Sequence, residues 1–435
     1  MISRTDFYKV AYIIYLSISI GFEGVNYSIL APFFPLEALS KQTSKYLIGV
    51  TIGMYDLANI LGVFAVPILL KKNTLFPLFV IGGILSGINQ ILFGFLHFSP
   101  SGPPFYINAM ISRFFGGIAS NLVWSAGFPL LTSVEPAWTS KVLALIELMI
   151  GLGFLIGPPL GSLLFGIGGY PLPFFVSGAI QIGVALSLII IPRKKISSES
   201  EVDSQIDSRT FLKFILNPTS IALASSILGF NSLSGIADTI IAPYLFNELS
   251  LTEDENGYIF GLTAAAILCS NLVFVKVIDK GYGGILYIMS LTLLAITCAL
   301  FFLQQWLHFL INLPIVMIIF VVLGTGIGAV NLSVYIVLEK TILNNSIVDV
   351  EGSKSLIALY LNLYFSVGRL FGAFFIGGFC YEHFGFFYTN GIAFTVISIS
   401  IAINIPVFVS SGFLNKIFYE NTRSKSLLSL NEIQT

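Results

Sequence analysis

The sequence contains few charged residues and very little histidine, cysteine or tryptophan. Only 10% of its 435 residues are Asp, Glu, Lys or Arg, and there are three His, three Cys and three Trp. A soluble domain of this size needs a more highly charged surface, so the composition excludes that class. The formal net charge of −1 argues against a nucleic-acid partner.

The shortage of histidine and cysteine limits the chemistry that we expect. His97, His308 and His383 follow or precede apolar spans without the spacing of metal ligands, so we expect no metal and no cofactor. No nucleophile motif is present, and we therefore expect no enzyme. The odd number of cysteines, all in or beside apolar spans, predicts no disulfide framework.

Apolar residues dominate what remains. Hydrophobic residues make up 56% of the chain, and the mean hydropathy is +0.91. Runs of about 20 apolar residues have the length that a helix needs to cross a bilayer. We predict an all-α membrane protein with twelve transmembrane helices. The expected spans are 7–33, 46–70, 75–98, 105–131, 141–165, 172–191, 219–246, 258–278, 284–303, 314–342, 353–379 and 387–409.

The spans divide into two sets of six. A polar stretch separates them, so we expect an N-terminal six-helix half at 1–191, a cytosolic linker at 192–218, a C-terminal six-helix half at 219–409 and a cytosolic tail at 410–435. Short matches recur at nearly one offset, such as a Gly-x-x-x-Gly pair that opens both span two and span eight. Pseudo-symmetric halves predict a transporter whose site lies where they meet.

The distribution of lysine and arginine predicts the orientation in the membrane. With a cytosolic N-terminus, nearly all of these residues fall on the cytosolic side, and only Lys41 and Lys45 lie opposite. The chain start runs directly into the first span without a cleavage site, so we interpret it as a retained helix. We expect both termini in the cytosol, and a monomer in the bilayer.

Six charged residues lie well inside the expected spans. Spans three, six, nine and twelve contain none, as expected if four peripheral helices surround a central cavity. Intramembrane charges of this kind are expensive and mark pathways or partners. The six are Glu23, Asp56, Arg113, Glu147, Asp238 and Arg369.

We assign these charges to candidate roles. Asp238 and Glu23, with Asp56, are candidates for coupling protons to substrate, because a carboxyl group in a low-dielectric site can hold either a proton or a cation. Arg113 and Arg369 are either substrate ligands or fixed partners of the acids. Asp56 and Glu147 have the alternative role of hydrogen-bonding groups in helix packing.

Other polar and aromatic residues on the same spans complete the candidate cavity. Asn231 shares a helical face with Asp238, and Asn362 shares one with Arg369. Trp124 and Tyr335 could offer aromatic faces to an ammonium group, although packing is the more common role of such residues.

One stretch combines an acid with glycines and a proline. Glu147 precedes Gly153-x-x-x-Gly157-Pro158-x-x-Gly161, whose glycines allow another helix to approach closely. We interpret the glycines and Pro158 as a seal, and Glu147 as a gate near the cytosolic mouth. Glu339, beside Lys340, is a second candidate for a gate.

These motifs resemble those of a known family over essentially the full length. Arg113-Phe-Phe-Gly-Gly117 resembles the Arg-x-x-x-Gly motif of the major facilitator superfamily, and the Gly153–Gly161 stretch resembles its proton-antiporter motif. Ala31-Pro-Phe-Phe-Pro-Leu-Glu-Ala38 and Gly377-Gly-Phe-Cys-Tyr-Glu-His-Phe-Gly385 resemble the vesicular amine transporter family, particularly its polyamine branch. The resemblance implies uptake of organic amines into vesicles or another acidic organelle, driven by the exit of protons.

The chain also departs from that family. The loop after span two keeps only Lys71-Lys72 of a Gly-rich basic motif, and Arg369 has no counterpart that we can match. A fixed cation opposes a polycationic substrate unless an acid such as Asp56 or Glu23 neutralises it.

Three functions follow. The leading hypothesis is a proton-coupled antiporter of small organic cations that works by alternating access. A second is an exchanger of anionic or zwitterionic solutes that uses Arg113 and Arg369. The third, from another class, is a non-transporting receptor or channel on the same fold.

Overall fold

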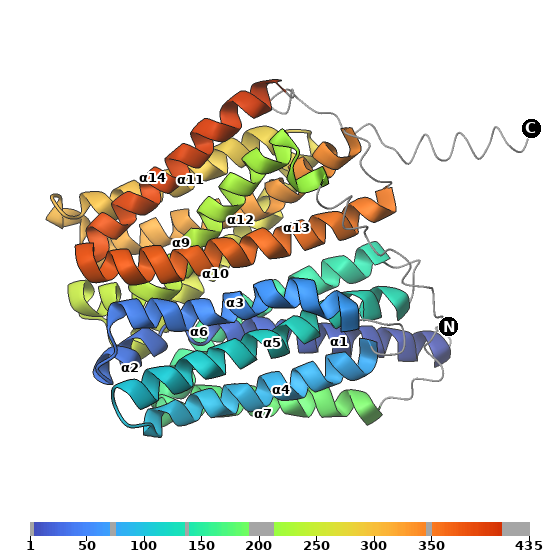
Figure 1. Ribbon diagram of the computed structural model, residues 1–435, viewed down its shortest axis with the longest axis horizontal. Coiled ribbons are helices and arrows are strands. Elements are labelled where there is room, and N and C mark those ends of the chain that lie inside the picture. The colour runs from blue at the N-terminus through green and yellow to red at the C-terminus, as the bar shows by residue number, and fades with distance from the viewer. Residues whose placement is uncertain (1–3, 70–74, 135–138, 191–212, 345–349, 411–435) are drawn as a thin grey trace, which may run out of the picture.

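The computed structural model describes residues 4–69, 75–134, 139–190, 213–344 and 350–410. Within these residues, twelve long helices run side by side (Figure 1). The first six are α1 (Arg4–Ser28), α3 (Lys45–Leu69), α4 (Leu75–Phe95), α5 (Pro103–Val134), α6 (Thr139–Gly168) and α7 (Pro171–Ile190). The second six are α9 (Pro218–Leu249), α10 (Glu253–Asp279), α11 (Gly283–Leu303), α12 (Leu313–Asn344), α13 (Val350–Phe371) and α14 (Tyr381–Ser410). The predicted all-α fold is confirmed.

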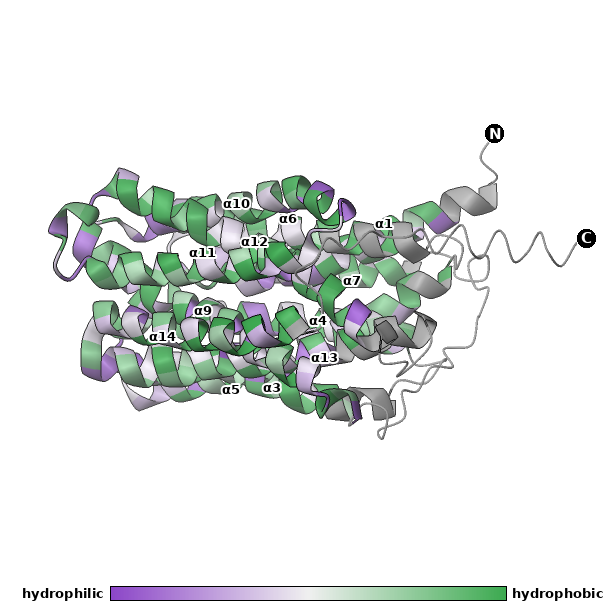
Figure 2. Cartoon of the chain, turned by 90° about the horizontal axis from the view of Figure 1, so that it is seen from above, coloured by the Kyte–Doolittle hydropathy of each residue, from purple (hydrophilic) through white to green (hydrophobic). Residues whose placement is uncertain are grey.

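The helices have the apolar character of membrane spans. By length and composition, ten segments of the described residues could cross a membrane; one of them, 360–409, runs from α13 into α14. The helix α1, which carries Ser17, Ser19, Glu23 and Asn26, is not among the ten. Green, the colour of hydrophobic residues, predominates on the visible helices, and polar residues, in purple, gather in the short connections at one end (Figure 2).

Two local features differ from the expected spans. The chain leaves α1 at Ser28, five residues before the predicted end, and forms the short helix α2 (Phe34–Ser40). Pro32 and Pro35 explain the break, because proline has no backbone N–H and is tolerated only in the first turn of a helix. A π-helix, η6 (Gly372–Cys380), joins α13 to α14. Gly385, with φ of 78°, then turns the chain into the last span, a conformation that glycine adopts readily.

The two sets of helices lie on opposite sides of the molecule in Figure 1, with α1–α7 below and α9–α14 above. Their buried hydrophobic residues separate in the same way. One large cluster draws only on residues 214–408, and two smaller clusters draw almost entirely on residues 12–188. The division into halves at 191 and 219 stays a prediction, because 191–212 and 411–435 lie outside the described residues.

Glycine pairs on α3 and α10 pack the two sets together. A Cβ at Gly49 would collide with Ala373 and Gly378 of η6, and one at Gly257 would collide with Pro158 and Ser162 of α6. Gly53 and Gly261 lie one turn further along and face Leu370 and Pro159. These are the two Gly-x-x-x-Gly pairs of the sequence repeat, and each lets a helix from one half approach the other closely.

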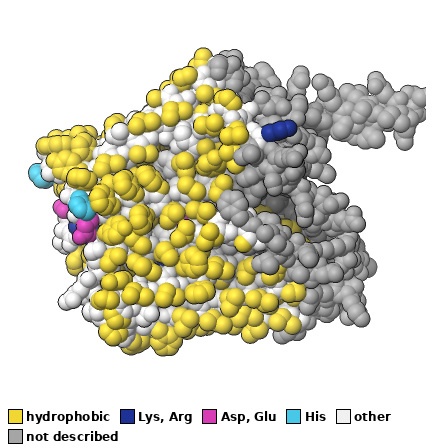
Figure 3. Space-filling view, in the orientation of Figure 1, with side chains coloured by type: hydrophobic (Ala, Val, Ile, Leu, Met, Phe, Trp, Pro, Cys, Tyr) yellow, Lys and Arg dark blue, Asp and Glu magenta, His cyan; other side chains and the backbone are white. Residues whose placement is uncertain are grey.

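The end of the bundle that carries α2, here called the α2 end, is opposite the end where α1 begins and α14 stops. In the view of Figure 3, hydrophobic side chains cover most of the described surface, and histidine and acidic side chains gather at the α2 end. There Glu382 accepts a hydrogen bond from the backbone N–H of Tyr46 at 3.2 Å, and Lys45 lies 4.2 Å from the ring centre of Tyr381. Both contacts join the two sets of helices.

Candidate functional site

An acid on α9 of one half meets a phenol on α1 of the other. The hydroxyl of Tyr27 donates a hydrogen bond of 2.6 Å to Oδ2 of Asp238. Both side chains are half-buried. Short hydrogen bonds to a carboxylate are the strong ones, so this contact ties the two halves together in the described state.

An ion pair lies beside this hydrogen bond. Nε of Arg369 on α13 is 3.3 Å from Oδ1 of Asp56 on α3, and its guanidinium carbon is 4.0 Å from the ring centre of Tyr27. The side chain of Asp56 is 2% exposed and that of Arg369 is 19% exposed. We call Tyr27, Asp56, Asp238 and Arg369 the interface cluster; both of its polar contacts cross between the halves.

Arg113 on α5 approaches the cluster through aromatic rings. Its guanidinium carbon lies 4.5 Å from the ring centre of Tyr55 and 5.7 Å from that of Tyr27. The residue is 6% exposed, and its Nε and Nη2 have no hydrogen-bond partner among the described residues. Arg113 thus differs from Arg369, which has an acid beside it.

Glu23 has its hydrogen-bond partners within the N-terminal half. It is 2% exposed and accepts hydrogen bonds from Ser86 on α4 at 3.0 Å and from Gln181 on α7 at 2.8 Å. Ser120 on α5 also hydrogen-bonds to it. Tyr55 in turn donates to Ser120 at 2.7 Å. Glu23 is therefore held inside the N-terminal half, and hydroxyl groups connect it to the rings beside Arg113.

The remaining cavity candidates lie in different surroundings. Asn231 is buried and donates to the carbonyl of Ile227 on its own helix at 2.9 Å, whereas Asn362 is exposed. Trp124 donates to Ser120 at 3.0 Å and so belongs with the Glu23 network. Tyr335 is 37% exposed. Glu339 is half-buried on α12.

The glycines of α6 face α1 of the same half. A Cβ at Gly153 would collide with the carbonyl of Gly21, and one at Gly157 would collide with Ser28. Gly161 packs against Phe33. Contact with the other half comes instead from Pro158 and its neighbours, which face α10. The side chain of Glu147 lies outside the described residues, so its proposed role as a gate stays a prediction.

Several residues that build the site are not among those singled out in the sequence. Ser86, Ser120, Gln181 and Tyr55 are ordinary residues within apolar spans. One signal was available. An amide inside a membrane span needs a hydrogen-bond partner, so Gln181 in the otherwise apolar α7 indicates a buried polar contact.

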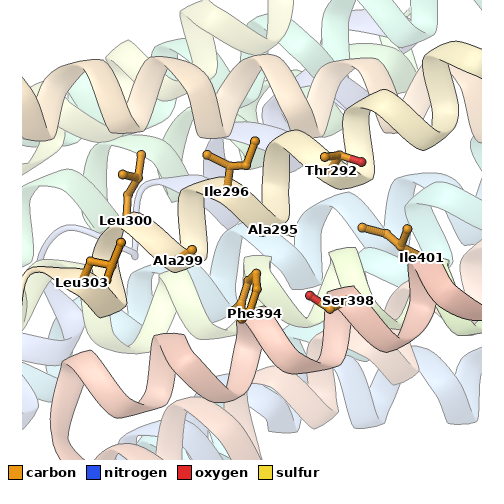
Figure 4. Close-up of a pocket in the computed structure, with 9 residues that line it drawn as sticks. All are labelled: Thr292, Ala295, Ile296, Ala299, Leu300, Leu303, Phe394, Ser398 and Ile401. Carbon is orange, nitrogen blue, oxygen red and sulfur yellow. The ribbon is translucent and has the colours of Figure 1, made fainter.

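No group of His, Cys, Asp or Glu among the described residues has the arrangement of a metal site. A separate groove of about 450 Å³ lies between α11 and α14 (Figure 4). Its lining is apolar apart from Thr292 and Ser398, and the Thr292 hydroxyl bonds to the carbonyl of Ile288 on its own helix. The groove therefore lacks the charged groups that the interface cluster provides.

The sequence matches the family model described as Major Facilitator Superfamily over residues 16–373. Among curated proteins, it is 27% identical to human MFS-type transporter SLC18B1 over 364 residues, covering 83% of this chain and 78% of that protein. The mouse SLC18B1 transporter is 32% identical over 255 residues, which cover 57% of this chain; the chain spans about half (53%) of the mouse protein. Multidrug resistance protein 2 of Bacillus subtilis is 24% identical over 324 residues, 67% of this chain and 77% of that protein.

Solved structures share the fold. A bacterial homologue of the human lysosomal transporter Spinster, in an inward-facing and occupied conformation, superposes with a TM-score of 0.72 at 13% identity, over 95% of this chain and 99% of that one. The nucleoside transporter NupG gives 0.71 at 12% identity, over 94% and 99%. The superfamily assignment from the motifs is thus confirmed: the chain belongs to the Major Facilitator Superfamily and is a multi-pass membrane protein.

Proposed function

We propose that the protein is a proton-coupled antiporter that moves small organic cations, polyamines or monoamines, across a membrane by alternating access. Its resemblance to vesicular amine transporters favours a vesicle or other acidic organelle. In this proposal both termini are cytosolic, the protein acts as a monomer, and protons leave the organelle as the amine enters.

The hydrogen bond from Tyr27 to Asp238 carries the proposal. The carboxylate belongs to α9 in one half and the hydroxyl to α1 in the other, and their 2.6 Å contact requires a free acceptor oxygen. A proton on Asp238, or an ammonium group bound to it, competes with the phenol for that oxygen. One acid can thus bind either the proton or the ammonium group, as exchange of a proton for a cation requires.

The ion pair of Asp56 and Arg369 makes a cationic solute acceptable beside Asp238. A fixed guanidinium without an acid would repel an ammonium group, but Asp56 lies 3.3 Å from Arg369 and balances its charge. Asp238 then provides the negative charge at the interface. Among the described residues, no basic side chain forms an ion pair with it as Arg369 does with Asp56.

The α2 end supplies the closed gate in this proposal. The contacts of Glu382 with Tyr46, and of Lys45 with Tyr381, join the halves there, as does the close approach of Gly49 to Gly378. With the termini in the cytosol, this end faces the lumen or the outside. Rocking of the halves would open these contacts and expose the interface cluster to the opposite side.

The substitution Asp238→Asn in proteoliposomes with an acidic interior tests the proposal. Wild type should accumulate spermidine or a monoamine and release protons as it does so. The amide cannot carry the proton, so uptake should fall by at least about tenfold, the loss expected when a charged hydrogen-bonding group is removed.

Two matched controls make this result specific. Asp279→Asn changes an exposed acid at the end of α10 and should transport normally. Glu147→Gln tests the gate separately; equal loss in Glu147→Gln and Asp238→Asn would contradict a proton site on α9. Uptake that persists in Asp238→Asn would reject the proposed coupling residue.

The other two hypotheses predict different signals in the same vesicles. An anion exchanger would accumulate organic anions and ignore amines. A channel would give a steady current without added solute, and a receptor would bind amines without moving them or protons.

A further inference from the structure

Arg113 has an environment that is unusual for a buried cation. It is 6% exposed, and Nε and Nη2 lack hydrogen-bond partners within the described part of the chain. Buried polar groups are nearly always hydrogen-bonded, and a charged group without partners is especially costly. The residue therefore offers donors that the described protein groups leave unused.

The described acids near Arg113 are already engaged elsewhere. Asp56 lies against Arg369, and Asp238 accepts the hydroxyl of Tyr27. Glu23 accepts from Ser86 and Gln181. No described acid forms an ion pair with Arg113. Arg369 also has Nε and Nη2 without hydrogen-bond partners among the described residues, but it has the charge of Asp56 beside it.

The aromatic contacts of Arg113 do not replace an acceptor. The faces of Tyr55 and Tyr27 attract the positive charge, at 4.5 and 5.7 Å from the guanidinium carbon. A ring face is a poor acceptor for several N–H groups, because a guanidinium has five donors in a fixed fork. That fork matches the two oxygens of a carboxylate.

Tyr27 links Arg113 to the acid of the interface cluster. The guanidinium carbons of Arg113 and Arg369 lie 5.7 and 4.0 Å from its ring centre, and its hydroxyl bonds to Asp238. A solute that displaces the Tyr27 hydroxyl from Asp238 would lie one tyrosine side chain away from Arg113. Two binding groups of opposite sign thus border one aromatic surface.

We propose that the transported solute is an amine that also carries a carboxylate, with its ammonium group on Asp238 and its carboxylate on Arg113. This proposal rests on the antiport function above, and replaces plain amines by amines with an anionic group as the preferred solutes. Arg113 acts as a specificity-determining residue: it selects amines with an anionic group over plain amines of the same length.

Proton release from acid-loaded proteoliposomes, followed with a pH-sensitive dye inside the vesicles, tests this selection. The added solutes are straight-chain alkylamines and ω-amino acids of matched carbon number. Wild type should release protons faster with the amino acids. Arg113→Gln should lose roughly tenfold or more of the amino-acid response, the size expected for a hydrogen bond between charged groups, and keep the alkylamine response. Arg113→Lys should restore part of the loss, since it keeps the charge without the fork.

A neighbouring control and a binding measurement guard against misfolding. Ser112→Ala removes a hydroxyl that bonds to Asn89 on α4 and should leave the ratio of the two responses unchanged. Purified wild-type protein should also gain thermal stability from the ω-amino acid and less from the matched alkylamine.

The outcomes separate the two proposals. Equal responses of wild type to both series, or a loss in Arg113→Gln that is the same for both, would overturn the role of Arg113 and leave antiport of amines intact. Absence of proton release with every solute would instead count against antiport itself. A faster response to plain amines would favour the polyamine class and reject the carboxylate.

Discussion

Contacts between the halves differ in kind from contacts within a half. Across the halves, the interface cluster relies on one hydrogen bond to Asp238 and one ion pair between Asp56 and Arg369. Within the N-terminal half, Glu23 is held by donors from three other helices. Loss of one partner leaves Glu23 bound, whereas a single ligand can break a cross-half contact. The difference agrees with the proposed mechanism, in which the halves move as units about contacts that a proton or solute can replace.

The largest effect should come from removing one of the two charges of the ion pair between the halves. Asp56→Asn leaves Arg369 without its acid, and an uncompensated buried charge lowers the free energy of unfolding by about 3–5 kcal/mol. The double variant Asp56→Asn/Arg369→Gln removes both charges and should recover most of that loss. Thermal unfolding of the purified protein measures both. A double variant as unstable as Asp56→Asn would show that the two charges do not act as a pair.

The acid inside the half should respond differently. In Glu23→Gln one acceptor oxygen becomes a donor that faces Ser86 or Gln181, so the free energy of unfolding should fall by about 1–3 kcal/mol. Because Glu23 is our second candidate for carrying the proton, accumulation driven by a pH gradient should also be lost. Exchange of solute for solute needs no proton and should continue, because the cross-half contacts are intact.

Two flux measurements on the same vesicles distinguish the possible roles of Glu23. Ser86→Ala serves as the control, because it removes one donor and leaves the acid. If Glu23→Gln stops exchange as well as accumulation, Glu23 is part of the solute path. If both persist, Glu23 has only a structural role.

The sequence predicted the fold well, because each span had to be apolar and long enough to cross a bilayer. The predicted spans match the helices closely, and only the break after Ser28 and the π-helix at Gly372 were missed. Both depend on local backbone geometry, which apolar runs do not encode. The Gly-x-x-x-Gly pairs were interpreted only as a repeat, whereas in the structure they lie at two close contacts between the halves, where packing requires small residues.

The site was only partly predictable. Intramembrane charge alone indicated Asp56, Asp238 and Arg369, which the structure brings together. It also indicated Glu23. The sequence could not show, however, whether the face of α1 that carries Glu23 meets the other half or the interior of the N-terminal half. That distinction depends on how α1 is rotated against α4 and α7, and so on tertiary packing.

The smallest effects should come from Gly→Ala substitutions, one at a contact within a half and one at a contact between the halves. In Gly153→Ala the new methyl group would meet the carbonyl of Gly21 in the same half, where the helices cannot separate, so the free energy of unfolding should fall by about 1–3 kcal/mol. In Gly257→Ala the methyl group would meet Pro158 and Ser162 of the other half. Opening of the α2 end relieves that collision, so stability should fall by less, and uptake should slow because the closed gate forms less often. Gly183→Ala, where a Cβ meets no neighbour, should lose neither. Equal loss of stability at Gly153 and Gly257, with unchanged uptake, would mean that the halves do not separate where α6 meets α10.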